Sequence, residues 1–184
     1  MKIGSLVLLA LLICSGAFAQ DQDIVTINPK TPRVTLAPTP TLIVKQGGKS
    51  SVQLMFRVIP GFHINSNKPN SELLIPTLIN WDVPTDISLA KTVYPPGQDY
   101  SFSFSPDEKL SVYTGDFTVN SLVMAAKSTP KGTYRVHGTL RYQACDNRAC
   151  YPPATVPIAF DVQVAKPAST AVRRNPAQSP HIHK

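Results

Sequence analysis

Apolar and polar residues alternate with a period of two along four stretches of this 184-residue chain. Alternation of this kind predicts β-strands that bury one face and expose the other. The two longest stretches lie on either side of a short segment that contains two cysteines. The four stretches are residues 52–58, 100–104, 134–142 and 156–164.

Turn-forming residues separate these stretches, and no segment has the apolar spacing of an amphipathic helix. Clusters rich in glycine, proline or aspartate lie at residues 46–49, 94–97, 105–107 and 129–132. Many short strands punctuated by turns predict an all-β fold, an immunoglobulin-like β-sandwich. Ahead of it, the prolines of residues 20–41 favour an extended lead-in with one edge strand at Arg33 to Leu36.

The first nineteen residues have the features of a secretory signal peptide. Lys2 gives a positive start, residues 6–13 form an apolar core, and residues 17–19 provide a small-x-small cleavage site. Cleavage there predicts export to the periplasm, where disulfides persist, and leaves no membrane-spanning segment. Lipid attachment at Cys14 is a weaker alternative because Ile13, rather than a small residue, precedes it.

The charge of the chain is concentrated at its C-terminal end. The formal net charge of +7 falls to +6 without Lys2 and to +2 when the four basic residues after Val164 are also set aside. A nearly neutral body lacks the basic patch of a nucleic-acid-binding fold, so no nucleic-acid partner is expected. We expect a folded domain over residues 42–164 and a disordered basic tail over residues 165–184.

Cys145 and Cys150 are the cysteines that remain after signal cleavage, and they lie between the two strongest predicted strands. If those strands pair antiparallel, the connecting segment projects from one end of the sandwich with both sulfurs close together. A disulfide there closes a very small ring, which constrains the unfolded chain by only about 2 kcal/mol. Two interpretations stay open: a structural disulfide that ties a hairpin loop, or a pair that reacts.

The neighbours of the cysteines bear on this choice. Arg148 lies between them and favours a thiolate, whereas Asp146 beside Cys145 opposes it. Tyr151 and the two prolines that follow form a stiff, partly aromatic wall directly after Cys150. Such a wall suits a docking surface.

Several short motifs follow one another along the body of the chain. They are residues 60–69 (PGFHINSNKP), Leu74-Ile75-Pro76, residues 93–97 (VYPPG), residues 112–115 (VYTG), Tyr142-Gln143-Ala144-Cys145 and Cys150-Tyr151-Pro152-Pro153. In this order they resemble the N-terminal periplasmic domain of the thiol:disulfide interchange protein DsbD, whose redox motif the last two segments match. The resemblance covers about residues 44–164.

This resemblance implies an immunoglobulin-like domain that shuttles reducing equivalents by thiolate attack through a mixed disulfide. Carried over, Cys150 forms the mixed disulfide and Cys145 is the resolving thiol. The implied partners are a membrane-embedded electron donor and thioredoxin-fold periplasmic thiol proteins, and no cofactor is implied. Because the sequence shows neither the membrane-spanning region nor the thioredoxin-like domain of full-length members, we expect the donor to be another protein.

Family members also shield the cysteine pair with an aromatic cap loop. The best match is residues 100–106, with Phe102 or Phe104 as the shielding ring, although the family's Phe-Tyr-Gly pattern is absent. The alternative is that these aromatics are ordinary core residues of a strand. His63 belongs to the segment 61–65, which packs near the redox site in the family, and it either tunes the reactive thiol or has a structural role.

Two other functions compete with thiol–disulfide exchange. A non-catalytic immunoglobulin-like binding module would carry the disulfide only as a structural bond. A copper or zinc site of Cys145, Cys150 and His63 has soft ligands but lacks clear metal-ligand spacing, so no metal is expected. His137 alternates with the buried residues of its strand and is expected to face solvent. The nucleophile elbow, the phosphate-binding loop and the H-E-x-x-H zinc motif are absent from the sequence.

Overall fold

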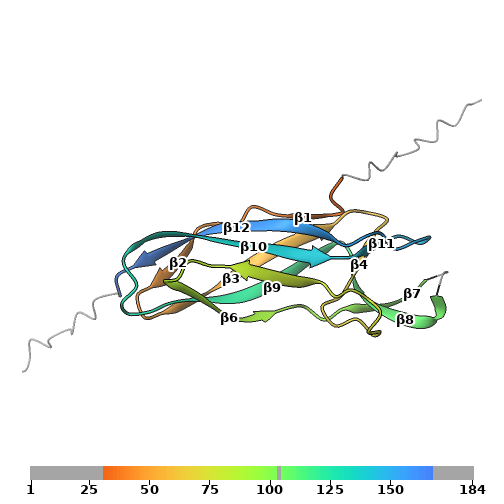
Figure 1. The fold of residues 1–184 in the computed structure, drawn as a ribbon, viewed down its shortest axis with the longest axis horizontal. Coiled ribbons are helices and arrows are strands. Elements are labelled where there is room, and N and C mark those ends of the chain that lie inside the picture. Colours follow the sequence, from red (N-terminus) through yellow and green to blue (C-terminus); the bar gives the residue numbers. More distant parts are fainter. Residues whose placement is uncertain (1–30, 103–104, 168–184) are drawn as a thin grey trace, which may run out of the picture. The chain divides into compact units, whose positions relative to one another are not determined.

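The computed structural model describes residues 31–102 and 105–167, and of residues 105–108 only the backbone. Strands make up the regular structure of these residues, and none of them forms a helix long and apolar enough to cross a membrane (Figure 1). The predicted signal peptide, Phe104 and the chain after residue 167 lie outside the described residues. The strands are β1 (Val34–Leu36), β2 (Leu42–Lys45), β3 (Lys49–Val58), β4 (His63–Asn65), β5 (Leu78–Asp82), β6 (Ile87–Val93), β7 (Gln98–Phe102), β8 (Ser105–Tyr113), β9 (Asp116–Ala125), β10 (Gly132–Tyr142), β11 (Ala144–Cys145) and β12 (Ala154–Ala165).

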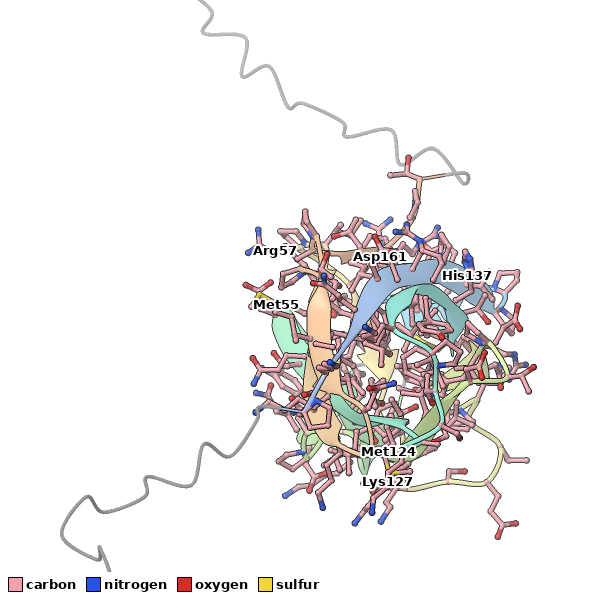
Figure 2. All side chains as sticks on the ribbon, turned by 90° about the vertical axis from the view of Figure 1, so that its left-hand side faces the viewer. Met55, Arg57, Met124, Lys127, His137 and Asp161 are labelled. Carbon is pink, nitrogen blue, oxygen red and sulfur yellow. A yellow bond between two sulfur atoms is a disulfide. The ribbon has the colours of Figure 1, made fainter. Side chains whose placement is uncertain are left out.

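Two of the sheets formed by these strands share one hydrophobic core. The first has the strand order β1-β3-β9-β6 and the second the order β2-β12-β10-β5. Buried side chains of β3, β9, β10 and β12 belong to a single cluster, so the two sheets pack face to face as an immunoglobulin-like sandwich. Figure 2 views the molecule from the left-hand side of Figure 1; Met55 of the first sheet and His137 of the second lie on the outside, and both are exposed.

The hairpin of β10 and β12 carries the cysteine segment. Its antiparallel register runs from the pair Gly132–Val164 to the pair Tyr142–Ala154. Alternate side chains of β10 and β12 are buried, as their period-two pattern predicts. The two strands and their antiparallel pairing are therefore confirmed, and residues 143–153 connect them at one end of the sandwich (Figure 1).

A third sheet, of order β11-β4-β8-β7, lies at that same end (Figure 1). Cys145 of β11 pairs with His63 of β4, and Ile64 of β4 pairs with Tyr113 of β8. The chain enters β4 after Gly61, whose φ of 82° is a conformation that glycine adopts without steric cost. Segments far apart in the sequence therefore meet around the cysteines.

The other predicted strands are also present. Residues 52–58 lie within β3, and the predicted edge strand at Arg33 to Leu36 corresponds to β1 at the edge of the first sheet. Residues 100–102 form the end of β7.

The predicted turn at residues 105–107 is wrong, because these residues belong to β8. Ser101 pairs with Lys109, whereas the next residue, Phe102, pairs with Ser105. The residues between Ser105 and Lys109 are therefore extra residues of β8 that have no paired residue on β7, and they form a bulge. Proline occurs both in turns and at bulges, so the sequence alone does not distinguish the two.

Candidate functional site

The two cysteines form a disulfide at the end of the β10–β12 hairpin. Their sulfur atoms are 2.02 Å apart and their Cα atoms 4.0 Å apart. The two residues differ in burial, since Cys145 is fully buried and Cys150 is exposed. An incoming thiolate therefore reaches this disulfide from the side of Cys150.

The carboxylate of Asp146 organises the small ring that the disulfide closes. Its Oδ1 accepts the backbone N–H groups of Arg148 at 2.7 Å and Ala149 at 2.9 Å, and its Oδ2 accepts the Tyr151 hydroxyl at 2.6 Å. The Tyr151 hydroxyl first, and then the backbone donors, hold the pKa of Asp146 below its usual value. In return, the carboxylate raises the pKa of Tyr151. The carboxylate of Asp146 is thus negatively charged at neutral pH, in a ring that also contains Arg148.

Backbone hydrogen bonds complete this ring. The Asp146 N–H donates to the Ala149 carbonyl at 3.0 Å, and the Tyr151 N–H donates to the Ala144 carbonyl at 2.8 Å. Neither these bonds nor those to the Asp146 carboxylate involve a sulfur atom. We therefore expect the ring to keep its shape when the disulfide is reduced.

His63 lies opposite Cys145 in the third sheet. It is buried, and its Nε2 has no hydrogen-bond partner among the described residues. Burial lowers the pKa of the imidazole, and the charge of Asp146 opposes that shift. At neutral pH the imidazole is therefore uncharged, so it does not supply a positive charge to the cysteines.

Phe102 stacks on His63, with ring centroids 3.9 Å apart and an interplanar angle of 16°. It is buried in a small cluster separate from the sandwich core. That cluster consists of Phe102, Leu110 and Val112, with Leu74 packed against it. Its position fits both sequence interpretations, because Phe102 packs among strand residues and also reaches the cysteine pair through His63. Tyr100, on the same strand, stacks on Phe102 at 6.0 Å but is 46% exposed.

Arg33 reaches the same end of the molecule, although the sequence marked it only as the start of an edge strand. Its guanidinium carbon lies 4.0 Å from the centroid of the Tyr151 ring and 5.1 Å from that of Phe62. The residue is 9% exposed, and its Nε has no hydrogen-bond partner among the described residues. A single basic residue at a strand end has no local pattern that reveals such a contact.

Amide side chains connect the cysteine segment to the upstream motifs. The Nδ2 of Asn65 donates to the Ile75 carbonyl at 3.0 Å and to Oε1 of Gln143 at 3.3 Å. Gln143 Nε2 donates to the Tyr151 carbonyl at 3.2 Å, and the Thr77 hydroxyl donates to the Asn65 carbonyl at 2.6 Å. The motifs around residues 60–69, 74–76 and 142–153 therefore lie together in space.

The described ranges offer no metal centre beside the disulfide. Within residues 31–102 and 105–167, no three His, Cys, Asp or Glu side chains gather as a metal-binding group. The two sulfurs of the copper or zinc site considered above are bonded to each other in this state. What the arrangement presents chemically is an accessible disulfide with a buried, uncharged imidazole opposite Cys145 and a buried guanidinium on the ring of Tyr151, the residue after Cys150.

The fold and this site define an immunoglobulin-like sandwich domain that carries an accessible disulfide at one end. A family model described as the N-terminal domain of the thiol:disulfide interchange protein DsbD matches residues 33–162. The chain belongs to this DsbD N-terminal domain family.

Solved structures give further similarities. The reduced N-terminal domain of DsbD from Neisseria meningitidis is 23% identical, with a TM-score of 0.40 and coverage of 68% of this chain and 83% of that one. The N-terminal periplasmic domain of ScsB from Proteus mirabilis is 15% identical, with a TM-score of 0.48, and the match covers 78% of this chain and 51% of the ScsB chain. A type I cohesin from Pseudobacteroides cellulosolvens is 14% identical, with a TM-score of 0.45 and coverage of 82% and 98%. No curated protein matches the chain.

Proposed function

We propose that this protein is a periplasmic thiol–disulfide exchange module that uses the Cys145–Cys150 pair to pass reducing equivalents between other proteins. The observation that carries the proposal is the disulfide itself, with one buried and one exposed cysteine, in a domain of the DsbD N-terminal family. A purely structural bond has no need of this asymmetry, whereas exchange requires one sulfur that a partner can attack.

In the reductive half of the cycle, a thiolate of a dithiol donor protein attacks the sulfur of Cys150. The Cys145–Cys150 bond breaks, Cys145 leaves as a thiolate that takes up a proton, and a mixed disulfide joins Cys150 to the donor. The donor's second thiolate then attacks the donor sulfur of that mixed disulfide. The donor leaves as a disulfide, and this domain holds two thiols after gaining two electrons and two protons.

In the oxidative half, the Cys150 thiolate attacks the disulfide of an acceptor protein and displaces one acceptor thiolate. Cys145 then attacks Cys150 within the mixed disulfide, which restores the internal disulfide and releases the acceptor as a dithiol. In this scheme Cys150 contacts partners and Cys145, which is buried, is the resolving thiol.

We assign the donor to a membrane-embedded protein and the acceptors to thioredoxin-fold thiol proteins of the periplasm. Membership of the family supports both assignments, and the matched domain of ScsB is described as periplasmic. Phe102 and His63 act as a shield on the side of Cys145, and Tyr151 forms part of the surface that a partner meets beside Cys150. The stacked pair Phe102–His63 and the half-buried position of Tyr151 support these roles.

Trapping of mixed disulfides tests the proposal. Reduced Cys145→Ser retains the attacking thiol but lacks the resolving one, so it should accumulate a mixed disulfide with an oxidised thioredoxin-fold protein. Cys150→Ser is the matched control and should accumulate none, because its remaining thiol is buried. Both reactions are analysed by non-reducing electrophoresis, and any mixed disulfide is identified by mass.

The reduction potential of the wild-type pair is the second measurement. A value above about −300 mV places the bond among exchangeable disulfides. A value clearly below that, together with equal trapping by the two variants, would identify a structural disulfide in a non-catalytic binding module and overturn the proposal.

A further inference from the structure

Arg33 occupies an unusual position at the cysteine end of the molecule. Its guanidinium contacts the rings of Tyr151 and Phe62, and those two rings are themselves 5.7 Å apart between centroids. Arg33 directly precedes β1, and its carbonyl accepts the Ile59 N–H at 3.0 Å, which fixes its backbone beside the turn into β4. The side chain thus links the first sheet to the residue that directly follows Cys150.

A guanidinium buried to this extent costs free energy unless other groups compensate its charge. The two ion pairs found among the described residues join Arg57 to Asp116 and Arg135 to Asp161, and Arg33 is part of neither. Its Nε has no hydrogen-bond partner there either. Aromatic faces compensate a cation in part. One of the rings that Arg33 covers belongs to Tyr151, whose hydroxyl donates to the carboxylate of Asp146.

We propose that Arg33 is a positioning residue for the exchange reaction, which stacks on Tyr151 to hold the cysteine ring and places a buried positive charge beside the residue that directly follows Cys150, where the thiolate forms. This inference rests on the proposed function. Arg33 contacts Tyr151, the Tyr151 hydroxyl donates to Asp146, and Asp146 accepts two backbone N–H groups of the ring. Because no link in this series is a sulfur atom, the series persists in the dithiol form.

The electrostatic part follows from the groups that surround the ring. Asp146 is negative and disfavours a thiolate, and Tyr151, with its raised pKa, is uncharged at neutral pH. His63 is buried and uncharged, and Arg148, which contributes to the lowered pKa of Asp146, is exposed, so solvent and salt screen its charge. Arg33 is the cation of this group whose charge lies in a buried environment, where it acts most strongly on a nearby anion.

The test measures the pH dependence of thiol reactivity in the reduced mature protein. Each variant is treated with iodoacetamide at a series of pH values, and alkylation of Cys150 is followed by peptide mass. Arg33→Met should raise the apparent pKa of the Cys150 thiol by about one unit, since a nearby cation favours the thiolate. The thiolate population at pH 7 then falls about tenfold, but its higher basicity offsets part of this, so the rate should fall about threefold.

Two further variants separate charge from packing. Arg33→Lys keeps the positive charge, so the apparent pKa of its Cys150 thiol should stay close to that of the wild type. Arg135→Met removes one positive charge from an exposed ion pair on β10 and should leave the profile unchanged. If Arg33→Met does not fold, Arg33→Gln replaces it, because the planar amide can still stack on Tyr151 without a charge.

A Cys150 profile that is the same in wild type and in the neutral Arg33 variants overturns this role, even if those variants are less stable. Failure of the proposed function looks different. If the reduced wild-type protein does not reduce an oxidised thioredoxin-fold protein and Cys145→Ser traps no mixed disulfide with it, the reaction that Arg33 would serve is absent and both proposals fail. Intact wild-type exchange with an unchanged profile in Arg33→Met removes the role of Arg33 alone.

Discussion

The sandwich core and the cysteine end are built from different kinds of side chain. Apart from Ser121 of β9, the core between the two large sheets is apolar, and its members come from alternate positions of long strands. The cysteine end instead buries polar groups among aromatic rings. Those polar groups are Arg33, His63, Asn65, Ser66, Thr77 and Ser111.

This difference in side chains suggests different roles for the two regions, one in stability and the other in reactivity. Apolar packing needs volume and shape, whereas each buried polar group needs a partner at a defined distance. Thr77 and the Nδ2 of Asn65 have such partners, but Arg33 Nε, His63 Nε2 and Asn65 Oδ1 have none among the described residues. We infer that the core supplies most of the free energy of unfolding and that the cysteine end is organised for reactivity.

The largest effect should come from the core. Phe56 is fully buried and stacks on Phe117 with centroids 5.3 Å apart. Phe56→Ala should lower the free energy of unfolding by about 3–5 kcal/mol, because it leaves a cavity. Urea denaturation measures this change. The reduction potential of the cysteine pair should stay close to that of the wild type.

Met55→Ala is the matched control, since Met55 is the neighbouring residue on β3 and is 54% exposed. It should change the free energy of unfolding by less than about 0.5 kcal/mol. If Phe56→Ala shifts the reduction potential as strongly as it lowers stability, the separation between core and cysteine end is wrong.

Removal of the disulfide should have a smaller effect on stability and a complete effect on exchange. Replacement of both cysteines by serine should lower the free energy of unfolding by about 2 kcal/mol, because the lost ring is small. The hydrogen bonds of Asp146 remain available to hold the segment. Urea denaturation and transfer of reducing equivalents to a thioredoxin-fold disulfide provide the two measurements. Global unfolding of this variant would mean that the bond is chiefly structural.

Removal of the Phe102 ring, which we propose shields the side of Cys145, should change the rate at which the disulfide is reduced. Phe102→Ala removes the ring that stacks on His63. Reduction of the disulfide by dithiothreitol should become several times faster, with a smaller loss of stability than in Phe56→Ala because the Phe102 cluster is small. Tyr100→Ala alters an exposed neighbour on the same strand and should leave the rate near that of the wild type. Equal rates in Phe102→Ala and wild type would show that Phe102 is only a packing residue.

Local pattern was sufficient to predict the core hairpin. The alternation along residues 134–142 and 156–164 identified β10 and β12 and the position of the cysteine segment between them. The same rule missed β9, in which Ser121 and Ala125 occupy buried positions. A small or polar residue at a buried position breaks the apolar signal, although the backbone pairing with β3 is continuous.

The cysteine end was less accessible to sequence reasoning because its contacts join distant segments. The resemblance of motifs led to His63, Tyr151 and Phe102, but the contact of Arg33 with Tyr151 spans more than a hundred residues. Periodicity describes one strand at a time and carries no information about which loops meet. The turn predicted at residues 105–107 was wrong for the same reason, because only the register of β8 with β7 decides between a turn and a bulge.

The smallest predicted effect concerns the pH dependence of stability at the cysteine end. The pKa of Asp146 is lowered in the folded state, first by the Tyr151 hydroxyl and then by backbone donors. A carboxyl group with a lowered folded pKa contributes stability above its unfolded pKa of about 3.9, and this contribution disappears as the pH falls through the folded value. Since Asp146 is only partly buried, the contribution should be small.

Asp146→Asn keeps the size of the side chain and an oxygen for the backbone N–H groups but removes the charge. Wild type should therefore lose more stability than this variant between pH 5 and pH 2, a range set about the unfolded value of about 3.9. Thermal unfolding across this range measures the difference. Tyr151→Phe removes the largest cause of the shift and should behave like an intermediate between the two. Parallel curves for wild type and Asp146→Asn would show that the carboxylate is not stabilised in the folded ring.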